Sequence, residues 1–325
     1  MALNIGEFGE RMNVLARART PFLFMVDFEM QRPEIFPLDE IDHTEILYHV
    51  NGRTNGLAVG SSPRELRLNK VPISSETYNL KFQQVYDHLA YGDSYLTNLT
   101  IKTEVEMPFT LLELFHASRA RYKLFFRDAF LVFSPEIFIQ VVDGVIRSYP
   151  MKGTIDASIA NAAEIILQDA KEIAEHVTIV DLIRNDLSTV AHSVAVERFR
   201  YLEKITTIDR ELLQVSSSIR GTVTEYYSER LGDLLVALLP AGSVSGAPKR
   251  KTMQIIAESE GEPRGYYSGV FGIFDGQSLD SGVMIRFIEQ QEGRYYYRSG
   301  GGITARSDRN KEYQEAIDKI YVPVS

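Results

Sequence analysis

Residues 265–304 read GYYSGVFGIFDGQSLDSGVMIRFIEQQEGRYYYRSGGGIT, and this stretch decides the fold class. Runs of aromatic and β-branched residues alternate there with the turn pairs Asp275-Gly276 and Glu292-Gly293. Such pairs between strand-like runs are typical of hairpin turns. A similar pattern occupies residues 94–150, with a turn at Asp143-Gly144. Because the strands follow one another so closely, we expect antiparallel sheets.

Helical patterns lie between and after these two strand-rich regions. Apolar residues recur at helical spacing through residues 158–187. Further helices are expected at residues 229–239, 249–259 and 309–320. Blocks of strands and blocks of helices predict an α+β fold, with sheets at the centre and helices outside. The first ninety residues are less regular, and we expect them to complete a sheet edge.

The composition of the 325 residues excludes several functional classes. The formal net charge is −9 and no run of five basic residues occurs, so we expect no nucleic-acid partner and no anionic membrane surface. The chain has no cysteine, which excludes disulfides, thiolate metal sites and a cysteine nucleophile. The first twenty residues lack the apolar segment of a signal peptide. We therefore expect a cytoplasmic protein that does not enter a membrane.

Two pairs of glutamates are candidate metal ligands. Glu172 and Glu175 stand three residues apart on one expected helix, and Glu312 and Glu315 do so on another. Residues at this spacing share a helix face. Each pair is either part of a solvated face or part of a site at which the two faces converge on a hard cation. Mg²⁺ suits such a site, because it binds through a few carboxylates and keeps positions for water and substrate oxygens.

Small residues form two further candidate ligand-binding segments. PAGSVSGAPKRKT, residues 240–252, departs from the spacing of a P-loop. It remains either a tight loop that offers N–H groups and hydroxyls to an anion or a simple helix cap. Gly300-Gly301-Gly302 lets a ligand approach the backbone closely, or forms a plain turn.

Two basic residues stand where their charge calls for a partner. Arg286 lies inside the apolar run GVMIRFIE, and a buried cation needs a counter-charge. An internal pair with a carboxylate such as Asp280 is favoured, and a forked contact with a substrate carboxylate is the alternative. Lys152 lies in RSYPMKGTI, residues 147–155, either as a solvated loop residue or as an amine presented to a substrate.

Several segments together resemble the chorismate-utilising enzymes, most closely the aminodeoxychorismate synthase component I members. The family also includes anthranilate synthase component I, isochorismate synthase and salicylate synthase. The segments cover residues 90–320 in family order and read GDSYLTNLT, FSPEIF, YPMKGT, EIAEHVTIVDLIRNDL, PAGSVSGAPKRKTMQII, RGYYSGVFGIF, VMIRF and GGGITARSDRNKEYQEAIDK. The resemblance implies an anthranilate synthase component I-like α/β sandwich with two facing antiparallel sheets and outer helices. It implies one chorismate-binding domain over residues 1–325, with residues 1–90 as a shortened N-terminal portion that completes the sheets and residues 90–320 as the catalytic core.

The resemblance also implies roles for individual residues. Mg²⁺ is expected on Glu175 and Glu315, with Glu172 and Glu312 completing its shell through water. The expected contacts to substrate are Ser243, Tyr267, Arg286, Gly301, Gly302 and Lys319.

Lys152 stands at the position that separates members of the family. Aminodeoxychorismate synthases carry lysine there, and anthranilate synthases usually carry alanine. An amine beside C2 of chorismate would attack as the C4 hydroxyl leaves, and ammonia would then enter at C4 and expel the lysine. A lysine attacks only when deprotonated, so we expect nearby cations to lower the pKa of Lys152. Glu136 matches the general acid that protonates the departing hydroxyl.

Two departures from other family members narrow the expected reaction. The water-using members carry a lysine base in the strand that corresponds to residues 95–99, and none occurs here. Gln214 replaces a histidine found in the aromatising members, which argues against pyruvate elimination. A tryptophan feedback site is not expected, because the N-terminal region lacks its motif.

The expected function is therefore amination of chorismate at C4 to 4-amino-4-deoxychorismate, for 4-aminobenzoate and folate synthesis. The alternatives are an anthranilate synthase component I, which would form anthranilate and pyruvate, and an inert relative that only binds a glutaminase. Because the chain has no cysteine, ammonia must come from a separate glutamine amidotransferase subunit or from solution.

Overall fold

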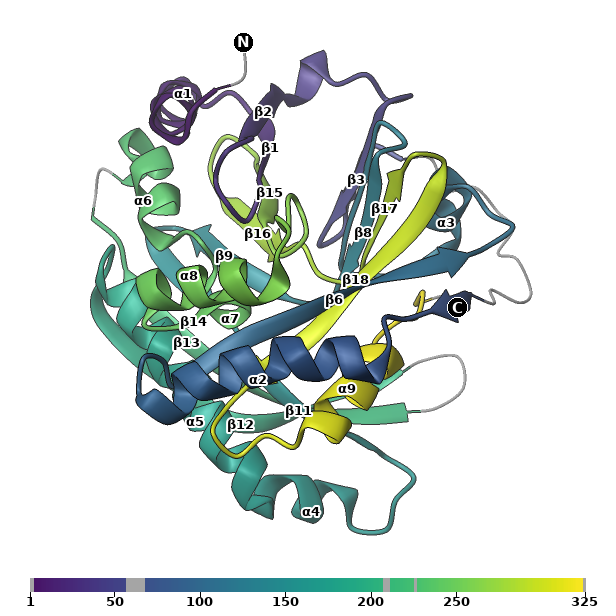
Figure 1. Ribbon diagram of the computed structural model, residues 1–325. Helices are drawn as coiled ribbons and strands as arrows, with labels where there is room; N and C mark the ends of the chain where they lie inside the picture. The colour runs from purple at the N-terminus through teal and green to yellow at the C-terminus, as the bar shows by residue number, and fades with distance from the viewer. Residues whose placement is uncertain (1–2, 57–67, 207–210, 225–226, 324–325) are drawn as a thin grey trace.

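Two antiparallel sheets form the centre of the molecule, and helices cover their outer faces (Figure 1). The computed structural model describes residues 3–56, 68–206, 211–224 and 227–323. Within these residues each sheet has nine strands. The two antiparallel sheets with outer helices that the sequence predicted are confirmed.

The first sheet combines strands from the N-terminal, middle and C-terminal parts of the chain. Its strand order is β11 (Met151–Asp156), β13 (Glu211–Thr222), β10 (Val145–Ser148), β9 (Ile137–Val142), β16 (Leu279–Val283), β15 (Val270–Phe274), β1 (Phe22–Val26) and β2 (Glu34–Pro37). A further long strand, β12 (His192–Thr206), pairs with β13. β11 therefore lies beside β13 and carries Lys152 at the margin of this sheet.

The second sheet faces the first. Its strand order is β14 (Gly246–Ala247), β6 (Leu96–Glu106), β18 (Arg294–Ile303), β17 (Phe287–Gln291), β8 (Phe130–Ser134), β7 (Tyr122–Phe126), β3 (Ile46–Val50) and β4 (Arg53–Thr54), and β5 (Asn69–Val71) pairs with β6. The chain passes from this sheet to the first at residues 135–136, and returns at residues 284–286. Glu136 and Arg286 lie in these two crossings.

Helices close the outer faces of both sheets. α1 (Ile5–Arg17), α5 (Ala170–Ser188) and α6 (Leu231–Leu238) pack on the first sheet. α2 (Ser75–Tyr91) and α8 (Lys249–Glu260) pack on β6, α9 (Arg309–Asp318) packs on β18, and α3 (Leu111–Ala117) packs on β7 and β8. The remaining short helices are α4 (Ala162–Gln168), α7 (Gly242–Ser245), η1 (Leu38–Glu40) and η2 (Tyr227–Glu229).

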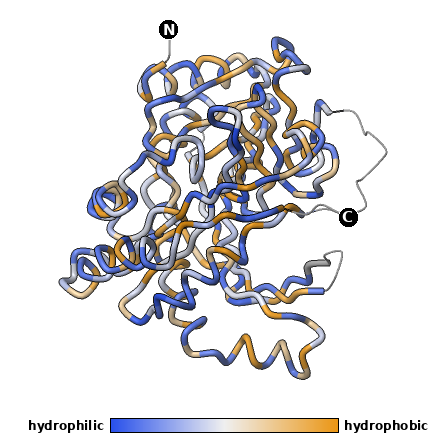
Figure 2. Tube along the Cα trace, turned by 45° about the vertical axis from the view of Figure 1, so that its right-hand side comes forward, coloured by the Kyte–Doolittle hydropathy of each residue, from blue (hydrophilic) through white to orange (hydrophobic). Residues whose placement is uncertain are grey.

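Strand β1 shows how one sequence serves two cores. All five of its residues are buried. Phe22, Phe24 and Val26 join the cluster under α1, and Leu23 and Met25 join the cluster between the sheets. This follows from the alternation of side chains across a strand. On the outer helices, by contrast, hydrophobic and hydrophilic positions alternate along the trace (Figure 2).

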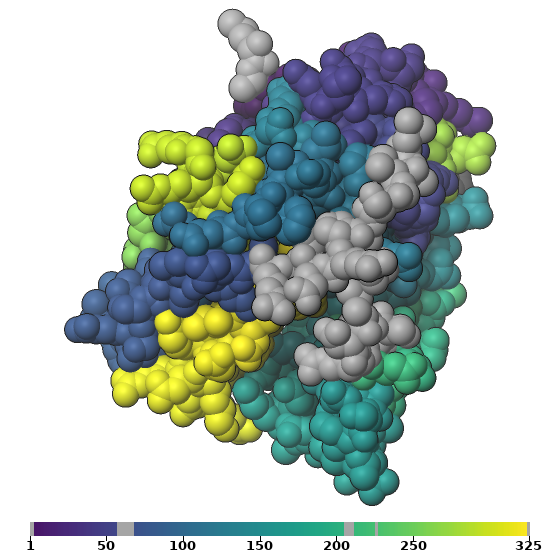
Figure 3. Space-filling view, turned by 90° about the vertical axis from the view of Figure 1, so that its right-hand side faces the viewer, coloured from purple at the N-terminus to yellow at the C-terminus, as the bar shows by residue number. Residues whose placement is uncertain are grey.

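Segments from both ends of the chain meet on one face. Tyr78 of α2 lies against Tyr313 of α9, with ring centroids 5.1 Å apart. In Figure 3 the yellow C-terminal residues lie beside the blue residues of α2. α9, which carries two of the candidate glutamates, is thus fixed against the second sheet.

The local turn signals predicted from the sequence are confirmed. Asp143 and Gly144 join β9 to β10 with φ of 49° and 74°, and Glu292 and Gly293 join β17 to β18 with φ of 51° and 78°. Asp275-Gly276 lies in the turn between β15 and β16. Left-handed backbone of this kind is where glycine, asparagine and aspartate occur.

Two predictions of the sequence reading need correction. The single helical pattern at residues 158–187 is in fact two helices, because Asp169 ends α4 and its side chain accepts a hydrogen bond from Glu172 N–H to start α5. The first ninety residues complete both sheets, since β1 and β2 lie at one edge of the first sheet and β3 and β4 at one edge of the second. Among the described residues, no helix is long and apolar enough to span a bilayer.

Candidate active site

Gly301 and Gly302 of β18 mark the point at which the candidate residues meet. A Cβ atom placed on Gly302 would lie 3.7 Å from Lys152 Nζ. The atoms around a Cβ placed on Gly301 are Lys319 Nζ at 3.4 Å, Glu315 Oε1 at 3.6 Å and Glu312 Oε2 at 3.7 Å. The two glycines therefore leave open a space between lysines and carboxylates, where a ligand can approach the backbone. The glycine run lies in a strand, and the alternative of a plain turn is wrong.

The four candidate glutamates come together from two helices. Glu172 and Glu175 belong to α5, and Glu312 and Glu315 belong to α9. Lys171 joins the two helices, because its Nζ lies 3.6 Å from Glu175 Oε1 and 3.6 Å from Glu312 Oε1. The glutamates therefore face one another rather than lying on separate solvated surfaces.

Lys152 belongs to a strand, β11, and turns toward this group of carboxylates. Its Nζ lies 2.8 Å from Glu175 Oε2, and its side chain is 29% exposed. The neighbouring Gly153 has φ of 89°, and a Cβ there would lie only 2.8 Å from Glu172 Oε2. The interpretation of Lys152 as a solvated loop residue is therefore wrong.

The protonation of Lys152 differs from the sequence prediction. Burial acts to lower the pKa of Lys152, but the carboxylates of Glu175, Glu315 and Glu172 outweigh it, so the pKa lies above its ordinary value. We expected a lowered pKa, and that expectation is wrong for the structure described here. Lys319 shows the opposite balance, since burial lowers its pKa more than Glu315 raises it. Lys319 is tied to Glu315 at 2.7 Å and donates to the carbonyl of Gly300 at 2.8 Å.

Glu136 is half-buried and accepts a hydrogen bond from the Ser243 hydroxyl. Burial raises the pKa of Glu136, although the Ser243 hydrogen bond and the charges of Arg286, Lys152 and Lys319 oppose the rise. A carboxyl group with a raised pKa can donate a proton near neutral pH. This arrangement brings together two residues that the sequence predicted separately, Glu136 and Ser243.

Arg286 pairs with no carboxylate among the described residues. Asp280, the partner favoured from the sequence, accepts instead from the Tyr122 hydroxyl at 2.6 Å and from Asn51 and Gln140 at 2.9 Å each. That prediction is wrong because Arg286 lies in the crossing after β16, where the strand alternation no longer applies. Its guanidinium lies over the Tyr321 ring at 4.8 Å, and its Nε is buried without a hydrogen-bond partner. Arg286 thus remains available to an external carboxylate.

Tyr267 is buried beside the same crossing. Its side chain is 4% exposed, and its ring meets that of Phe287 edge-on at 5.9 Å. Burial raises the pKa of Tyr267, so its hydroxyl stays protonated. A protonated hydroxyl in this position can donate a hydrogen bond to an anionic ligand.

The loop that presents Ser243 is held by a lysine at its far end. Lys249 Nζ lies 2.8 Å from Asp186 Oδ2 and donates to the carbonyl of Leu238 at 2.8 Å. Gly242 packs on the same carboxylate, since a Cβ there would lie 2.7 Å from Asp186 Oδ2. The segment at residues 240–252 is therefore more than a helix cap, because it contains the short helix α7, which places Ser243 beside Glu136.

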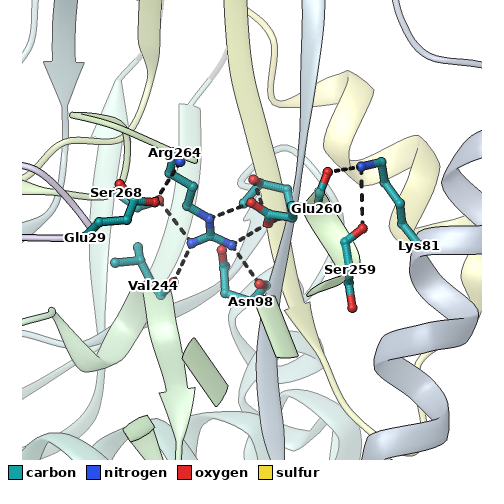
Figure 4. A network of polar contacts seen from close by, with 9 residues as sticks. Glu29, Lys81, Asn98, Val244, Ser259, Glu260, Arg264 and Ser268 are labelled. Atoms are coloured by element: carbon teal, nitrogen blue, oxygen red, sulfur yellow. Dashed lines mark hydrogen bonds and ion pairs between the residues drawn. The ribbon is translucent and has the colours of Figure 1, made fainter. Parts of the chain in front are cut away.

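A second, buried network fixes the other side of this loop (Figure 4). Arg264 and Glu260 form an ion pair at 2.6 Å, with side chains 1% and 3% exposed. The same guanidinium donates to the carbonyls of Val244 and Asn98 at 2.9 and 2.8 Å. Val244 follows Ser243 in the chain and Asn98 belongs to β6. The network thus joins the Ser243 loop to the second sheet.

The carboxylates fit a hard cation. Glu175 Oε1 is buried and has no hydrogen-bond partner in the part of the chain that the structure describes. Within that part, no three acidic, histidine or cysteine side chains already close around one point. Mg²⁺ needs only one or two protein carboxylates and takes its other ligands from substrate and water. The donors present therefore suit a cation that binds together with a ligand.

Sequence reasoning missed the residues that support the site. Lys171 is four residues before Glu175, which was visible, but its contact with Glu312 depends on the packing of α5 against α9. Asp186 and Lys249 lie within the quoted family segments, yet nothing in their spacing indicated that they pair.

A family model described as chorismate binding enzyme matches residues 40–325. The chain belongs to this family. Among its relatives, an uncharacterized PabA-like protein of Pasteurella multocida (strain Pm70) is 48% identical over 99% of this chain and 100% of its own length. Aminodeoxychorismate synthase component 1 of Klebsiella aerogenes is 35% identical over 76% of this chain. The match spans 57% of that synthase.

Solved structures agree with this assignment. The crystal structure of anthranilate synthase component I from Streptococcus pneumoniae TIGR4 superposes with a TM-score of 0.68 at 27% identity, and covers 80% of this chain and 60% of that one. The fold and the family are therefore established, and relatives with two different named reactions share them.

Proposed function

We propose that this chorismate binding enzyme adds ammonia to C4 of chorismate and releases 4-amino-4-deoxychorismate. The observation that carries the proposal is Lys152, whose amine lies 2.8 Å from Glu175 and borders the open space beside Gly302. Among the resembling enzymes, lysine at this position is typical of the aminodeoxychorismate synthases. The relative from Klebsiella aerogenes carries that name.

In the proposed reaction, the Lys152 amine bonds to C2 of chorismate while Glu136 gives its proton to the C4 hydroxyl, which leaves as water. Ammonia then bonds to C4 and the lysine leaves C2. The raised pKa of Glu136 supports its part, because the group must be protonated at the start. Lys152 must lose its proton before it attacks, and the neighbouring carboxylates act against this loss.

Substrate binding is assigned to groups that lie around the same space. Arg286 has no carboxylate partner among the described residues, and Tyr267 and Lys319 supply further donors to a dicarboxylate. Mg²⁺ would be held by Glu175 and Glu315, with Glu172 and Glu312 acting through water. When bound, it would supply positive charge to a substrate carboxylate.

Ammonia is favoured over water as the second nucleophile. A Cβ on Gly302 would lie 2.8 Å from Leu96 Cδ1, so the β6 side chain nearest this glycine is aliphatic and cannot act as a base. Because the chain has no cysteine, we propose that the ammonia comes from a separate glutamine amidotransferase subunit or from solution.

The reaction can be tested with purified protein, chorismate, Mg²⁺ and ammonium at alkaline pH, followed by an aminodeoxychorismate lyase. We expect 4-aminobenzoate only after the lyase is added. Formation of fluorescent anthranilate without the lyase would replace this proposal by the anthranilate synthase alternative. Unchanged chorismate in all arms would favour the inert relative.

The covalent step has its own test. Without ammonium, we expect intact-mass analysis to show a protein adduct equal to chorismate minus one water, because one water leaves for each lysine bond formed. Lys152→Ala should abolish both the adduct and the amination. Undiminished turnover in this variant would remove the lysine from the mechanism.

A further inference from the structure

A hollow at the opposite margin of the second sheet has an unusual lining. We call it the basic hollow, and it is formed by His49, Ser118, Arg119, Ala120, Arg121 and Lys123. Its volume is about 410 Å³, which is in the range of small-molecule pockets. Every ionisable residue in the lining is basic. None of these residues belongs to the candidate active site.

The backbone brings the basic side chains to one face. His49 of β3 is the direct cross-strand partner of Lys123 of β7, so their side chains lie side by side. Arg121 precedes Lys123 by two residues, and Tyr122 between them turns to the core between the sheets. Arg121, Lys123 and His49 therefore share the outer face of the sheet.

None of the three cations, Arg119, Arg121 and Lys123, has a carboxylate partner within the described residues. Arg119 and Arg121 are exposed, and their side chains make no hydrogen bond or ion pair there. Lys123 donates only to the carbonyls of Phe115 and Ser118, at 2.8 and 2.9 Å. The whole chain has 44 acidic and 35 basic residues, so a hollow with basic groups alone runs against its composition.

The unpaired charges also act on one another. Burial lowers the pKa of Lys123 to about 8. Burial lowers the pKa of His49 as well, and the charge of Lys123 adds to that effect. A bound anion would offset the desolvation of Lys123. The hollow is thus arranged for a negative ligand that the described part of the chain does not provide.

We propose that the basic hollow binds a small oxyanion with two or more negative charges, a phosphate or a polycarboxylate, separately from the candidate active site. The guanidinium groups of Arg119 and Arg121 have the planar fork that matches two oxygens of such a group. Lys123 supplies a point charge at the floor of the hollow. The site is independent of the reaction proposed above, and its binding can be measured without turnover.

The test is isothermal titration of the full chain with inorganic phosphate and, separately, with citrate, each against sodium chloride of equal ionic strength. We expect saturable binding of one anion per chain for at least one of the two probes. Phosphate alone would assign a phosphate group, and citrate alone a polycarboxylate. Heats that match sodium chloride for both probes would overturn the proposal.

Substitutions in and outside the basic hollow test where the anion binds. Arg119→Gln combined with Arg121→Gln should weaken it at least tenfold, and both side chains are exposed, so the fold should persist. Arg11→Gln is the matched control, because Arg11 is also exposed and forms no ion pair among the described residues. Arg286→Gln should leave the affinity unchanged. Equal affinity in the double variant, or loss in Arg286→Gln, would place the anion elsewhere and end the proposal.

Discussion

Replacing Arg264 by methionine should destabilise the protein strongly, because its partner Glu260 would stay charged in the interior. The two side chains are 1% and 3% exposed, and the guanidinium makes contacts at 2.6 and 2.9 Å with the two oxygens of Glu260. Glu260 Oε1 would keep the Thr100 N–H at 2.8 Å and the Thr100 hydroxyl at 2.9 Å. These two donors satisfy part of the carboxylate and leave its charge uncompensated.

The magnitude follows from the burial of the pair. Breaking a buried ion pair by removing one partner costs about 3–5 kcal/mol. The carbonyls of Val244 and Asn98 also lose their donor, and an unsatisfied buried acceptor adds roughly 1–3 kcal/mol, with incomplete additivity. We therefore expect a loss of at least about 3 kcal/mol, which is a large share of the roughly 5–15 kcal/mol typical of a folded domain.

Urea unfolding followed by circular dichroism measures this loss. Arg294→Met is the matched control, because Arg294 is 65% exposed and its pair with Glu104 at 3.4 Å should contribute less than about 1 kcal/mol. Combining Arg264→Met with Glu260→Met should recover part of the stability, because no charge is then left unpaired. If the free energy of unfolding falls no further in Arg264→Met than in Arg294→Met, the buried pair does not stabilise the fold.

Three further changes test the candidate active site. Lys152→Ala should reduce amination at least 100-fold in single-turnover assays, and retained amination would contradict this. Its free energy of unfolding in urea should fall by no more than about 3 kcal/mol, because Lys152 is partly exposed and its pair with Glu175 is not fully buried. Glu136→Gln should raise the thermal midpoint near pH 8 and not near pH 4. The pKa of Glu136 is higher in the folded protein than the 4.5 of the unfolded chain, so the wild type loses stability as the pH rises above 4.5 and the neutral glutamine does not. An equal effect at both pH values would show that the charge is not the cause. Gly302→Ala should fold but raise the KM for chorismate about tenfold, since its Cβ meets the flexible end of Leu96 at 2.8 Å; an unchanged KM would place the substrate elsewhere.

Sequence signals predicted local structure where the cause is local. The Asp-Gly and Glu-Gly turns follow from the left-handed backbone that such residues adopt, and the structure has them at the expected positions. The prediction of one helix over residues 158–187 was wrong, because apolar periodicity does not reveal where a side chain caps a new helix. Asp169 starts a new helix through its side chain, and no break in the apolar pattern marks that place.

The sequence predicted which residues form the site, but it did not predict which of them contact one another. Quoted family segments contained Glu136, Lys152 and Ser243, but the pairing of Glu136 with Ser243 depends on α7 meeting a crossing between sheets. Arg286 was assigned to Asp280 because a buried cation needs a counter-charge, but the structure commits Asp280 to Tyr122, Asn51 and Gln140. The raised pKa of Lys152 was missed because it arises from carboxylates on both α5 and α9.

The two crossings explain why an acid and several cations share one place. The chain leaves the second sheet at Glu136 and returns to it at Arg286, and the crossings run side by side, with Val283 N–H donating to the Glu136 carbonyl at 3.1 Å. Burial at the seam between the sheets raises the pKa of Glu136, although the charges of Arg286, Lys152 and Lys319 oppose the rise. A carboxyl group ionised by those cations could not donate a proton, and a site without them would have little hold on a dianion. Burial at this seam therefore favours the protonated Glu136 that the proposed loss of a hydroxyl from chorismate requires, and Arg286 stays charged to hold the substrate.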